Sequence, residues 1–405
     1  MTHQSSDDTE AILPLEGVRV VDLSRILSGP LCGMLLGDMG ADVIKVERPG
    51  GEDTRRVAPF YEGESVHTMT YNRNKRAMTL DTRAPAAEAI LVALVKWADV
   101  MIENYRPGTM RAMGFSHERL RELNPRLVVT SLSGFGQTGP LKGRAGFDCI
   151  AQAVSGLMSR NGPVDAGPQV AGLFVADHLA GVYGALGTVM ALYQRERTGE
   201  GQVVDVALLD ALFASLGPAL TQYLMLGELA PKTGNRDPFS APASVFVTKD
   251  DREVYIHAAT APLFARLCDV MQRQELLSDP RFIDEAARMA NVDDIEDVVG
   301  GWVATRTASA VEAECDGAGI PCAIVADFSE VASNPQLDER RMITQVEHPE
   351  LGSLTLPGIV LKLSDVPDVI RRPPPRVGEH NHEVYTTVLG MSDAELASLS
   401  AAGVI

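Results

Sequence analysis

Short apolar runs alternate with amphipathic segments through the first two hundred residues. Buried strands are predicted at 17–23, 41–47, 78–81, 100–103, 126–131 and 202–207, with helices at 30–39, 85–97 and 178–198. Two consecutive strands joined by a helix form a crossover unit, and crossover units build parallel sheets. The pattern therefore predicts an α/β fold whose large domain contains an open parallel sheet.

The pattern changes in the second half of the chain. An apolar helix is predicted at 208–226, a hairpin at 244–248 and 253–257, and a returning strand at 319–325. We expect a disordered lead-in at 1–12, a large α/β domain at 13–225 and a linker at 226–242. A small α+β domain at 243–330 and a C-terminal return to the large domain at 331–405 complete the predicted order.

Charge and cysteine content narrow the class of protein. The 405 residues carry a net charge of −18, which disfavours nucleic acid as a partner. Five cysteines without a C-x-x-C pair are typical of reduced thiols in a cytoplasmic protein. Eight scattered histidines give no metal-ligand spacing, so no metal is expected. No apolar run reaches the roughly 18 residues that a membrane span requires, so no membrane partner is expected either.

Asp177 opens the longest predicted helix and is the first candidate for chemistry. Its position is that of a helix N-cap, so a structural and a catalytic role both stay open. Gly181, Gly184 and Gly187 recur along one side of the same helix. Each costs the helix up to about 1 kcal/mol relative to alanine, which predicts a close neighbour on that side.

A glycine-rich string at 134–139 raises the possibility of a nicotinamide cofactor. The string follows a predicted strand, but Pro140 comes next instead of a helix, and the turn after the first strand lacks the fingerprint. These features disfavour an NAD-dependent oxidoreductase. The free N–H groups of such a loop could still hold a carbonyl oxygen or a phosphate.

Basic residues gather in predicted loops of this acidic chain. One group lies at 48–56, a second at 73–76, and Arg106 and Arg111 form a third. Local clusters of this kind suit a phosphate-bearing ligand, although solvated loop charges would look the same.

The chain resembles the class III CoA-transferases, the family of formyl-CoA transferase and carnitine CoA-transferase. The resemblance rests on the stretches 15–23, 40–50, 72–76, 103–108, 113–115, 198–202 and the C-terminal 378–405, together with the surroundings of Asp177. It implies a Rossmann-like CoA-binding domain, an interlocked homodimer and Asp177 as the nucleophile. The implied substrates are an acyl-CoA, possibly succinyl-CoA, and a small carboxylic acid, with no permanently bound cofactor.

The resemblance also implies a set of CoA-binding positions, with 133–136 as the loop over the thioester. With Lys75 and Arg111 added from the basic clusters, these are Leu27, Ser28, Arg48, Tyr71, Asn72, Arg73, Asn74, Lys75, Asn104, Tyr105, Arg106, Arg111, Ser133, Gly134, Phe135 and Gly136.

Two departures from formyl-CoA transferase bear on the substrate. Ala112 stands where that enzyme has an arginine, which leaves open whether Arg111 replaces it, and Leu27 replaces a glutamine beside the acyl group. Formyl transfer to oxalate is therefore not expected.

An α-methylacyl-CoA racemase of the same fold is the main alternative. Such an enzyme needs a histidine where this chain has Phe147, and phenylalanine cannot accept a proton. A non-enzymatic acyl-CoA-binding protein is a further alternative, and it requires Asp177 to be only a cap.

Overall fold

The structure is a computed structural model that describes residues 12–405. The lead-in expected at 1–12 thus lies, except for Ile12, outside the described residues. The described chain forms two compact units, one of residues 12–157, 170–221 and 335–405, the other of residues 158–169 and 222–334. The domain boundaries inferred from the sequence stay a prediction.

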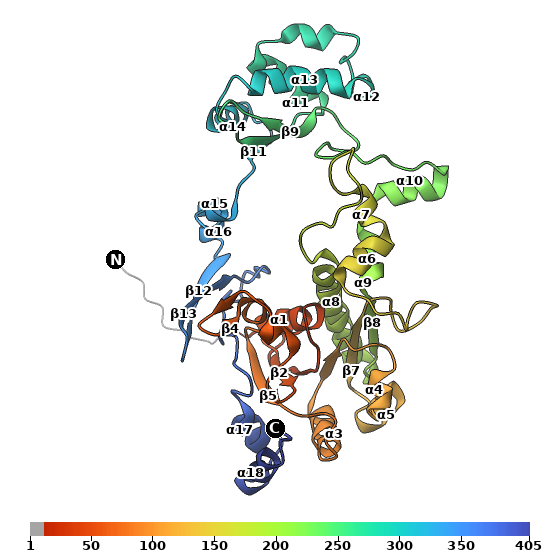
Figure 1. The fold of residues 1–405 in the computed structure, drawn as a ribbon, viewed down its shortest axis with the longest axis vertical. Helices are drawn as coiled ribbons and strands as arrows, with labels where there is room; N and C mark the ends of the chain where they lie inside the picture. Colours follow the sequence, from red (N-terminus) through yellow and green to blue (C-terminus); the bar gives the residue numbers. More distant parts are fainter. Residues whose placement is uncertain (1–11) are drawn as a thin grey trace. The chain divides into compact units, whose positions relative to one another are not determined.

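A six-stranded parallel sheet forms the centre of the first unit (Figure 1). Its strand order is β5-β2-β1-β6-β7-β8, and every neighbouring pair is parallel. This order reverses direction between β1 and β6, and open α/β sheets bind ligands at such a switch point. The strands are β1 (Arg19–Asp22), β2 (Asp42–Glu47), β5 (Lys75–Thr79), β6 (Val100–Glu103), β7 (Val128–Ser133) and β8 (Val203–Ala207).

Helices cover both faces of this sheet. Val20 faces a core that includes α1 and α8, whereas Val21 faces a core that includes α3, α5 and the C-terminal helix α18. The alternation follows from the two-residue period of a strand. The helices are α1 (Ser28–Asp38), α2 (Val66–Tyr71), α3 (Ala87–Trp97), α4 (Thr109–Ala112), α5 (His117–Leu123), α6 (Asp148–Ser155), α8 (Val175–Thr198), α9 (Leu208–Ser215), α16 (Pro335–Glu339), α17 (Asn381–Glu383) and α18 (Asp393–Ala401), with the short turns η1 (Asp53–Arg56) and η3 (Val384–Val388).

The three glycines of α8 contact their own chain. A Cβ atom on Gly181 would lie 2.9 Å from the Ser28 carbonyl oxygen, and one on Gly187 would lie 2.6 Å from Val204 Cγ1. Gly184 faces Leu132 and Cys32. The close neighbours predicted from the sequence are therefore α1 and the sheet itself, whose atoms occupy the space that a Cβ atom on these glycines would need.

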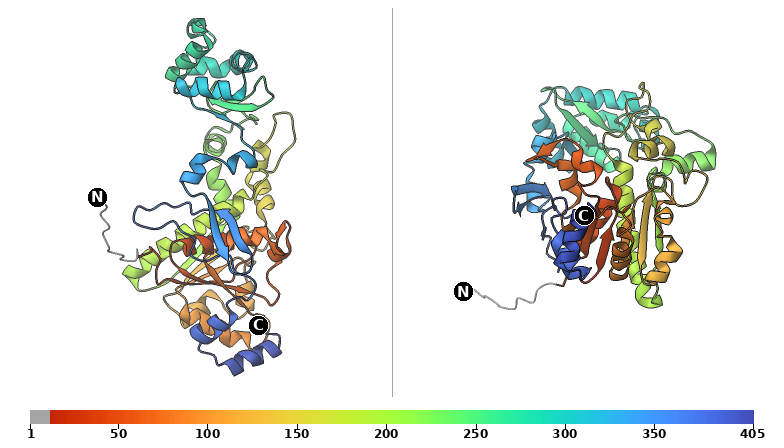
Figure 2. Two further views of the ribbon diagram at one scale, coloured as in Figure 1. Left: turned by 90° about the vertical axis from the view of Figure 1, so that its left-hand side faces the viewer. Right: turned by 60° about the horizontal axis from the view of Figure 1, so that its bottom comes forward.

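The C-terminal segment returns to the edge of the sheet, as the blue and red parts of Figure 2 show. His380 N–H donates to the Ala77 carbonyl, and Thr79 N–H donates to the Asn381 side chain. These bonds occupy polar groups of edge strand β5 that would otherwise be open to another chain. The returning segment also carries the hairpin β12 (Ile343–His348) and β13 (Gly352–Pro357), which the sequence analysis missed. A second small hairpin pairs β3 (Phe60–Tyr61) with β4 (Glu64–Ser65).

The second unit is built on a three-stranded antiparallel sheet in the order β11-β10-β9. Its core contains Phe246, Ile256, Phe264 and Trp302. The predicted hairpin is confirmed as β9 (Ala243–Val247) and β10 (Glu253–His257), with β11 (Cys322–Ile324) beside it. The helices are α11 (Ala261–Met271), η2 (Gln274–Ser278), α12 (Glu285–Ala290), α13 (Val292–Val303), α14 (Ala308–Gly317) and α15 (Phe328–Val331), while α7 (Leu157–Arg160) and α10 (Pro218–Leu226) lie where the chain passes between the units.

Two predicted elements need correction. The single helix expected at 208–226 is two helices, because Gly217 adopts a φ of 59° and Pro218 follows it. The basic run at 73–76 is only partly a loop, since Lys75 and Arg76 begin strand β5 with both side chains buried. Ion pairs to Asp22 and Asp42 compensate their charges, and sequence spacing could not reveal these partners.

Within the described residues, α8 alone is long and apolar enough to cross a membrane. The sequence analysis found no such segment. Length and composition are weak grounds for a span, because the core helix of a globular protein satisfies the same criterion. Ala180, Gly184 and Thr188 of α8 are buried against the first unit's own core.

Candidate active site

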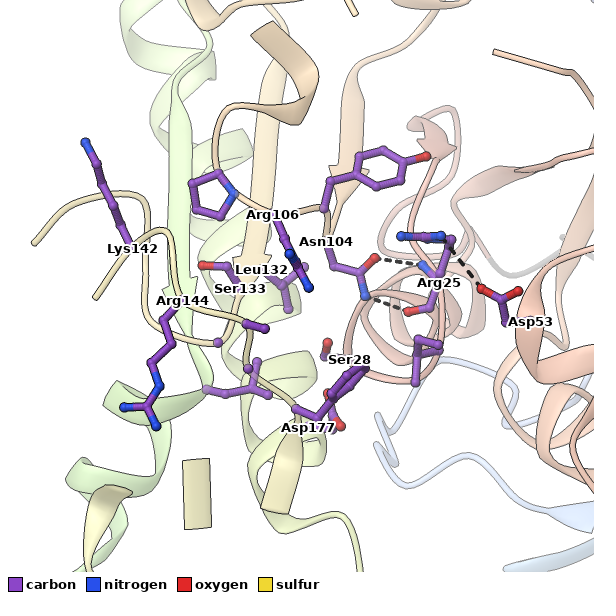
Figure 3. Close-up of a pocket in the computed structure, with 18 residues that line it drawn as sticks. Arg25, Ser28, Asp53, Asn104, Arg106, Leu132, Ser133, Lys142, Arg144 and Asp177 are labelled. Atoms are coloured by element: carbon purple, nitrogen blue, oxygen red, sulfur yellow. Dashed lines mark hydrogen bonds and ion pairs between the residues drawn. The ribbon is translucent and has the colours of Figure 1, made fainter. Parts of the chain in front are cut away.

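A pocket of about 230 Å³ lies at the carboxyl ends of β1, β6 and β7 (Figure 3). The turn after β1 contributes Arg25, Ile26 and Ser28, and the segment after β6 contributes Asn104 and Arg106. The loop after β7 and the start of α8 line it as well, and Asp53 and Leu208 complete the lining. The pocket thus occupies the switch point of the sheet, as expected for ligand binding in this topology.

Asp177 lines this pocket as the third residue of α8. The N-cap position belongs to Phe174, because His178 N–H donates to the Phe174 carbonyl and starts the helix earlier than predicted. The prediction that Asp177 is an N-cap is therefore wrong. Its carboxylate still lies in the first turn, where the helix dipole favours a negative charge.

The Asp177 carboxyl has an unusual electrostatic environment. It is only 8% exposed, and burial raises its pKa to about 6, with the nearby Asp148 charge acting in the same direction. Hydrogen bonds from the Ser28 hydroxyl and backbone N–H oppose this rise in pKa. Asp148 also accepts a hydrogen bond of 3.1 Å from the Asp177 backbone N–H, which ties α6 to the start of α8. The carboxylate is thus nearly buried on a residue whose backbone is anchored, and it is mostly ionised at neutral pH.

Hydrogen bonds fix the turn between β1 and α1. The Asn104 side chain accepts from Arg25 N–H at 2.8 Å and donates to the Arg25 carbonyl at 2.5 Å, as the dashed lines in Figure 3 show. Ile26 N–H donates to the Glu52 carboxylate at 2.8 Å. The turn therefore holds Ser28 in a defined place beside Asp177.

Cationic side chains surround the pocket. Arg25 lies 3.8 Å from Asp53, and Arg144 stacks over the Phe135 ring at 5.6 Å. In Figure 3 the Arg106 side chain extends toward Ser28, whereas Lys142 and Arg144 point outward. An anionic ligand would therefore meet positive charge at the entrance and at the centre.

Several predicted site residues come together here. Ser28, Asn104, Tyr105, Arg106, Ser133 and Gly134 line the pocket with Asp177. Arg111 lines a neighbouring hollow that shares Arg106 and Lys142 with the pocket. Arg48 lines another that shares Arg25 and Tyr105 with it. The carboxyl edge of the sheet thus carries three adjoining hollows.

Other predicted residues do not line these hollows. Asn72, Arg73, Asn74 and Lys75 are each at most 4% exposed. Arg73 and Asn74 donate to Asp38, and Lys75 donates to Asp22, the Pro30 carbonyl and Asn72. Their polar groups are already satisfied within the chain, which indicates a structural role.

The remaining predicted residues lie close to the pocket lining. Leu27 packs with Leu31 and Met34, and the Tyr71 hydroxyl lies 3.3 Å from His178 Nε2. The Phe135 ring supports Arg144, and Gly136 N–H donates to the Ser133 hydroxyl at 3.0 Å.

Sequence reasoning missed Arg25, Lys142, Arg144 and Asp148. Lys142 and Arg144 follow the glycine-rich string directly, a signal that could have found them. Asp148 gave no such signal, because its contact with Asp177 depends on how α6 and α8 pack.

The alternative chemistries find little support in the described residues. Residues 12–405 contain no group of three or more ligands suited to a metal ion. Phe147, where a racemase needs a histidine, is 64% exposed and lines the pocket. No proton acceptor stands at that position.

Comparisons with known proteins agree with this geometry. Residues 15–381 match the model of CoA-transferase family III. The chain is 37% identical to succinyl-CoA–D-citramalate CoA-transferase of Chloroflexus aurantiacus, over 97% of this chain and 98% of the relative. It is 34% identical to human succinyl-CoA:glutarate CoA-transferase, over 100% of this chain and 92% of the relative.

A solved structure shows the same fold. The crystal structure of a CAIB/BAIF family protein from Brucella suis superposes with a TM-score of 0.83 and 32% sequence identity, covering 93% of this chain and 99% of that one. The sequence resemblance is thus confirmed, and the chain belongs to CoA-transferase family III.

Proposed function

We propose that this CoA-transferase moves CoA between carboxylic acids through covalent intermediates on Asp177. The observation that carries the proposal is a buried, anchored carboxylate at the switch point of the sheet. A carboxylate can attack a thioester carbonyl without help from water or a metal.

The proposed reaction begins at the acyl-CoA carbonyl carbon. Asp177 attacks it, the C–S bond breaks, and a mixed anhydride and CoA thiolate form. The thiolate then attacks the aspartyl carbonyl, the donor acid leaves as a carboxylate, and an aspartyl-CoA thioester remains. The acceptor carboxylate attacks this thioester and expels the thiolate, which attacks the acceptor's acyl carbonyl to give the new acyl-CoA and free Asp177. No electrons or water are consumed, so burial serves to protect the activated intermediates.

Each attack creates an oxyanion that needs hydrogen-bond donors. The loop after β7 is the proposed source. Gly136 N–H already donates to Ser133, which leaves the N–H groups of Gly134 and Phe135 for this task. Ser28 would keep the Asp177 carboxylate oriented for attack.

We propose that CoA lies along the three adjoining hollows. Arg106 lines both the central pocket and the hollow that contains Arg111, and Tyr105 lines both the central pocket and the hollow that contains Arg48. Arg48 and Arg111 therefore mark the two outer hollows. Arg111 faces solvent and pairs with Glu118 at 3.3 Å, so it is available to a phosphate in place of the arginine missing at position 112. CoA and its thioesters are the only cofactor-like groups in this proposal.

The proposed substrates are dicarboxylic acids, with succinyl-CoA as the donor. The names of two relatives pair succinyl-CoA with citramalate and glutarate, and both acceptors carry two carboxylates. The Arg106 guanidinium beside the pocket centre suits such anions.

The proposal is tested with succinyl-CoA and a panel of mono- and dicarboxylic acids. We expect new acyl-CoA products from dicarboxylic acceptors, and a CoA adduct on the peptide that contains Asp177, both detected by mass spectrometry. Transfer without any adduct on that peptide would rule out the covalent route, and transfer limited to monocarboxylic acids would rule out the substrate class.

We further propose a homodimer, supported by an exposed apolar stripe on α8. Val182, Tyr183, Leu186, Met190 and Tyr193 are each at least 42% exposed on one helix. A second copy of the chain would cover this stripe, and an uncovered patch of this kind is unusual on a monomer.

The dimer is tested by placing a charge in the stripe. Leu186→Glu is expected to give a monomer in sedimentation equilibrium, because burying an unpaired carboxylate in an apolar interface is costly. Val360→Glu, at a site that is 63% exposed elsewhere in the first unit, is the matched control and should leave the mass unchanged. A dimeric Leu186→Glu variant would show that the stripe is not the interface.

A cytoplasmic location is proposed as well. All five cysteines are free, as expected in a reducing compartment.

A further inference from the structure

The turn between β1 and α1 contains a strained residue. Ile26 adopts a φ of 70°, in the left-handed region that β-branched side chains avoid. Six non-glycine residues among those described have positive φ, and Ile26 is the one with a β-branched side chain. Such strain persists only where neighbouring contacts enforce it, and it concentrates at functional sites.

A buried carboxylate enforces this conformation. Glu52 is 3% exposed and accepts the Ile26 N–H at 2.8 Å, while its other oxygen lies 3.4 Å from Lys45 Nζ. Glu52 itself is fixed, since its backbone N–H donates to Glu47 at 3.0 Å. Glu52 therefore reaches the turn from the segment after β2. It lines the adjoining hollow that contains Arg48, but not the pocket that contains Asp177.

The strained residue sets the place of Ser28. Ser28 is the first residue of α1, two positions after Ile26, and its side chain lies beside that of Asp177 in the pocket (Figure 3). The turn has little room, because a Cβ atom on Gly29 would lie 2.1 Å from Ser24 Cβ. A change of φ at Ile26 would thus move Ser28 relative to the nucleophile.

We propose that Glu52 is a positioning residue for CoA transfer, holding Ile26 in the left-handed conformation so that Ser28 orients Asp177. This inference rests on the proposed role of Asp177 as the nucleophile. Without the Glu52 carboxylate, isoleucine relaxes to negative φ and Ser28 shifts. Glycine adopts positive φ at no steric cost. With glycine at position 26, the turn therefore no longer needs the hydrogen bond to the Glu52 carboxylate.

The test is a rescue experiment. Glu52→Ala is expected to lower kcat roughly ten- to a hundredfold, with KM for acyl-CoA changed less than about threefold, because misplacing a reacting group costs rate more than binding. Adding Ile26→Gly should restore most of kcat. Adding Ile26→Ala should not, because alanine removes the side chain but keeps the Cβ atom that disfavours positive φ.

Several outcomes would overturn the proposal. These are an unchanged kcat in Glu52→Ala, equal recovery with glycine and alanine, or a lowered kcat that glycine does not restore in a folded protein. If Glu52→Ala does not fold, Glu52→Asp takes its place, since it keeps a charge near Lys45 but is one methylene short of Ile26. Asp177→Asn is assayed in parallel. Activity in that variant would refute the role of Asp177 as the nucleophile, independently of the role of Glu52.

Discussion

Asp177→Asn is expected to abolish CoA transfer and to raise the melting temperature at pH 7.5. The amide keeps the shape of the side chain but cannot form the anhydride. Burial raises the pKa of Asp177 to about 6, from an ordinary value of 3.8, so the folded state disfavours its ionised form. This difference between the folded and unfolded pKa values corresponds to a destabilisation on the order of 3 kcal/mol at neutral pH. The asparagine variant has no ionisable group at this position and lacks this destabilisation.

The sign of the pH dependence makes this expectation specific. Because the pKa is raised on folding, the wild type loses stability as the pH rises from about 4 to about 6. The gain from Asp177→Asn should therefore grow over that range and remain constant above it. Thermal melts at several pH values measure this gain in stability, with Glu88→Gln, a substitution of an exposed carboxylate, as the control. A variant that transfers CoA, or one that melts lower than wild type at pH 7.5, would contradict the expected result.

Lys75→Ala is expected to destabilise the first unit by about 3–5 kcal/mol, because it leaves a buried carboxylate without one of its partners. Lys75 and Asp22 are both fully buried and lie 2.9 Å apart, and Lys75 also donates to the Pro30 carbonyl. The same geometry predicts little change in KM for acyl-CoA in the fraction that folds. A direct CoA contact by Lys75 would give the opposite pattern.

Urea denaturation and steady-state kinetics separate the two roles of Lys75. Arg83→Ala is the matched control, since Arg83 pairs with Asp81 at 3.0 Å but its side chain is 86% exposed. Exposed pairs contribute little, so the unfolding midpoint of the control should stay near that of wild type. A raised KM with unchanged stability in Lys75→Ala would show that this residue contacts CoA directly.

Local pattern sufficed for much of the fold. The run at 100–103 became β6 over the same residues, and the long helix predicted to stop before Gly199 does so, with Gly199 at a φ of 76°. In each case the signal lies within a few neighbouring residues.

Such local patterns could not predict contacts between residues that lie far apart in the sequence. A run of charges such as 73–76 is typical of a solvated loop. Here its basic residues pair with Asp22, Asp38 and Asp42, which lie more than 30 positions away in the sequence. The same limit applies to the site. Asp177 and the glycine-rich string stood out by their positions in the sequence, and the resemblance supplied their expected roles. Asp148, Glu52 and the strain at Ile26 depend on packing alone.

The C-terminal return constrains how the enzyme matures on the ribosome. Edge strand β5 forms hydrogen bonds with His380 and Asn381, some 300 positions later in the chain. Asp81 N–H, just after this strand, donates to the carbonyl of Val404. At roughly 5–20 residues per second, β5 remains open for about 15–60 s of synthesis. The first unit is therefore completed only after residues 380–404 have left the ribosome, and until then the edge of β5 is open to pairing with another chain.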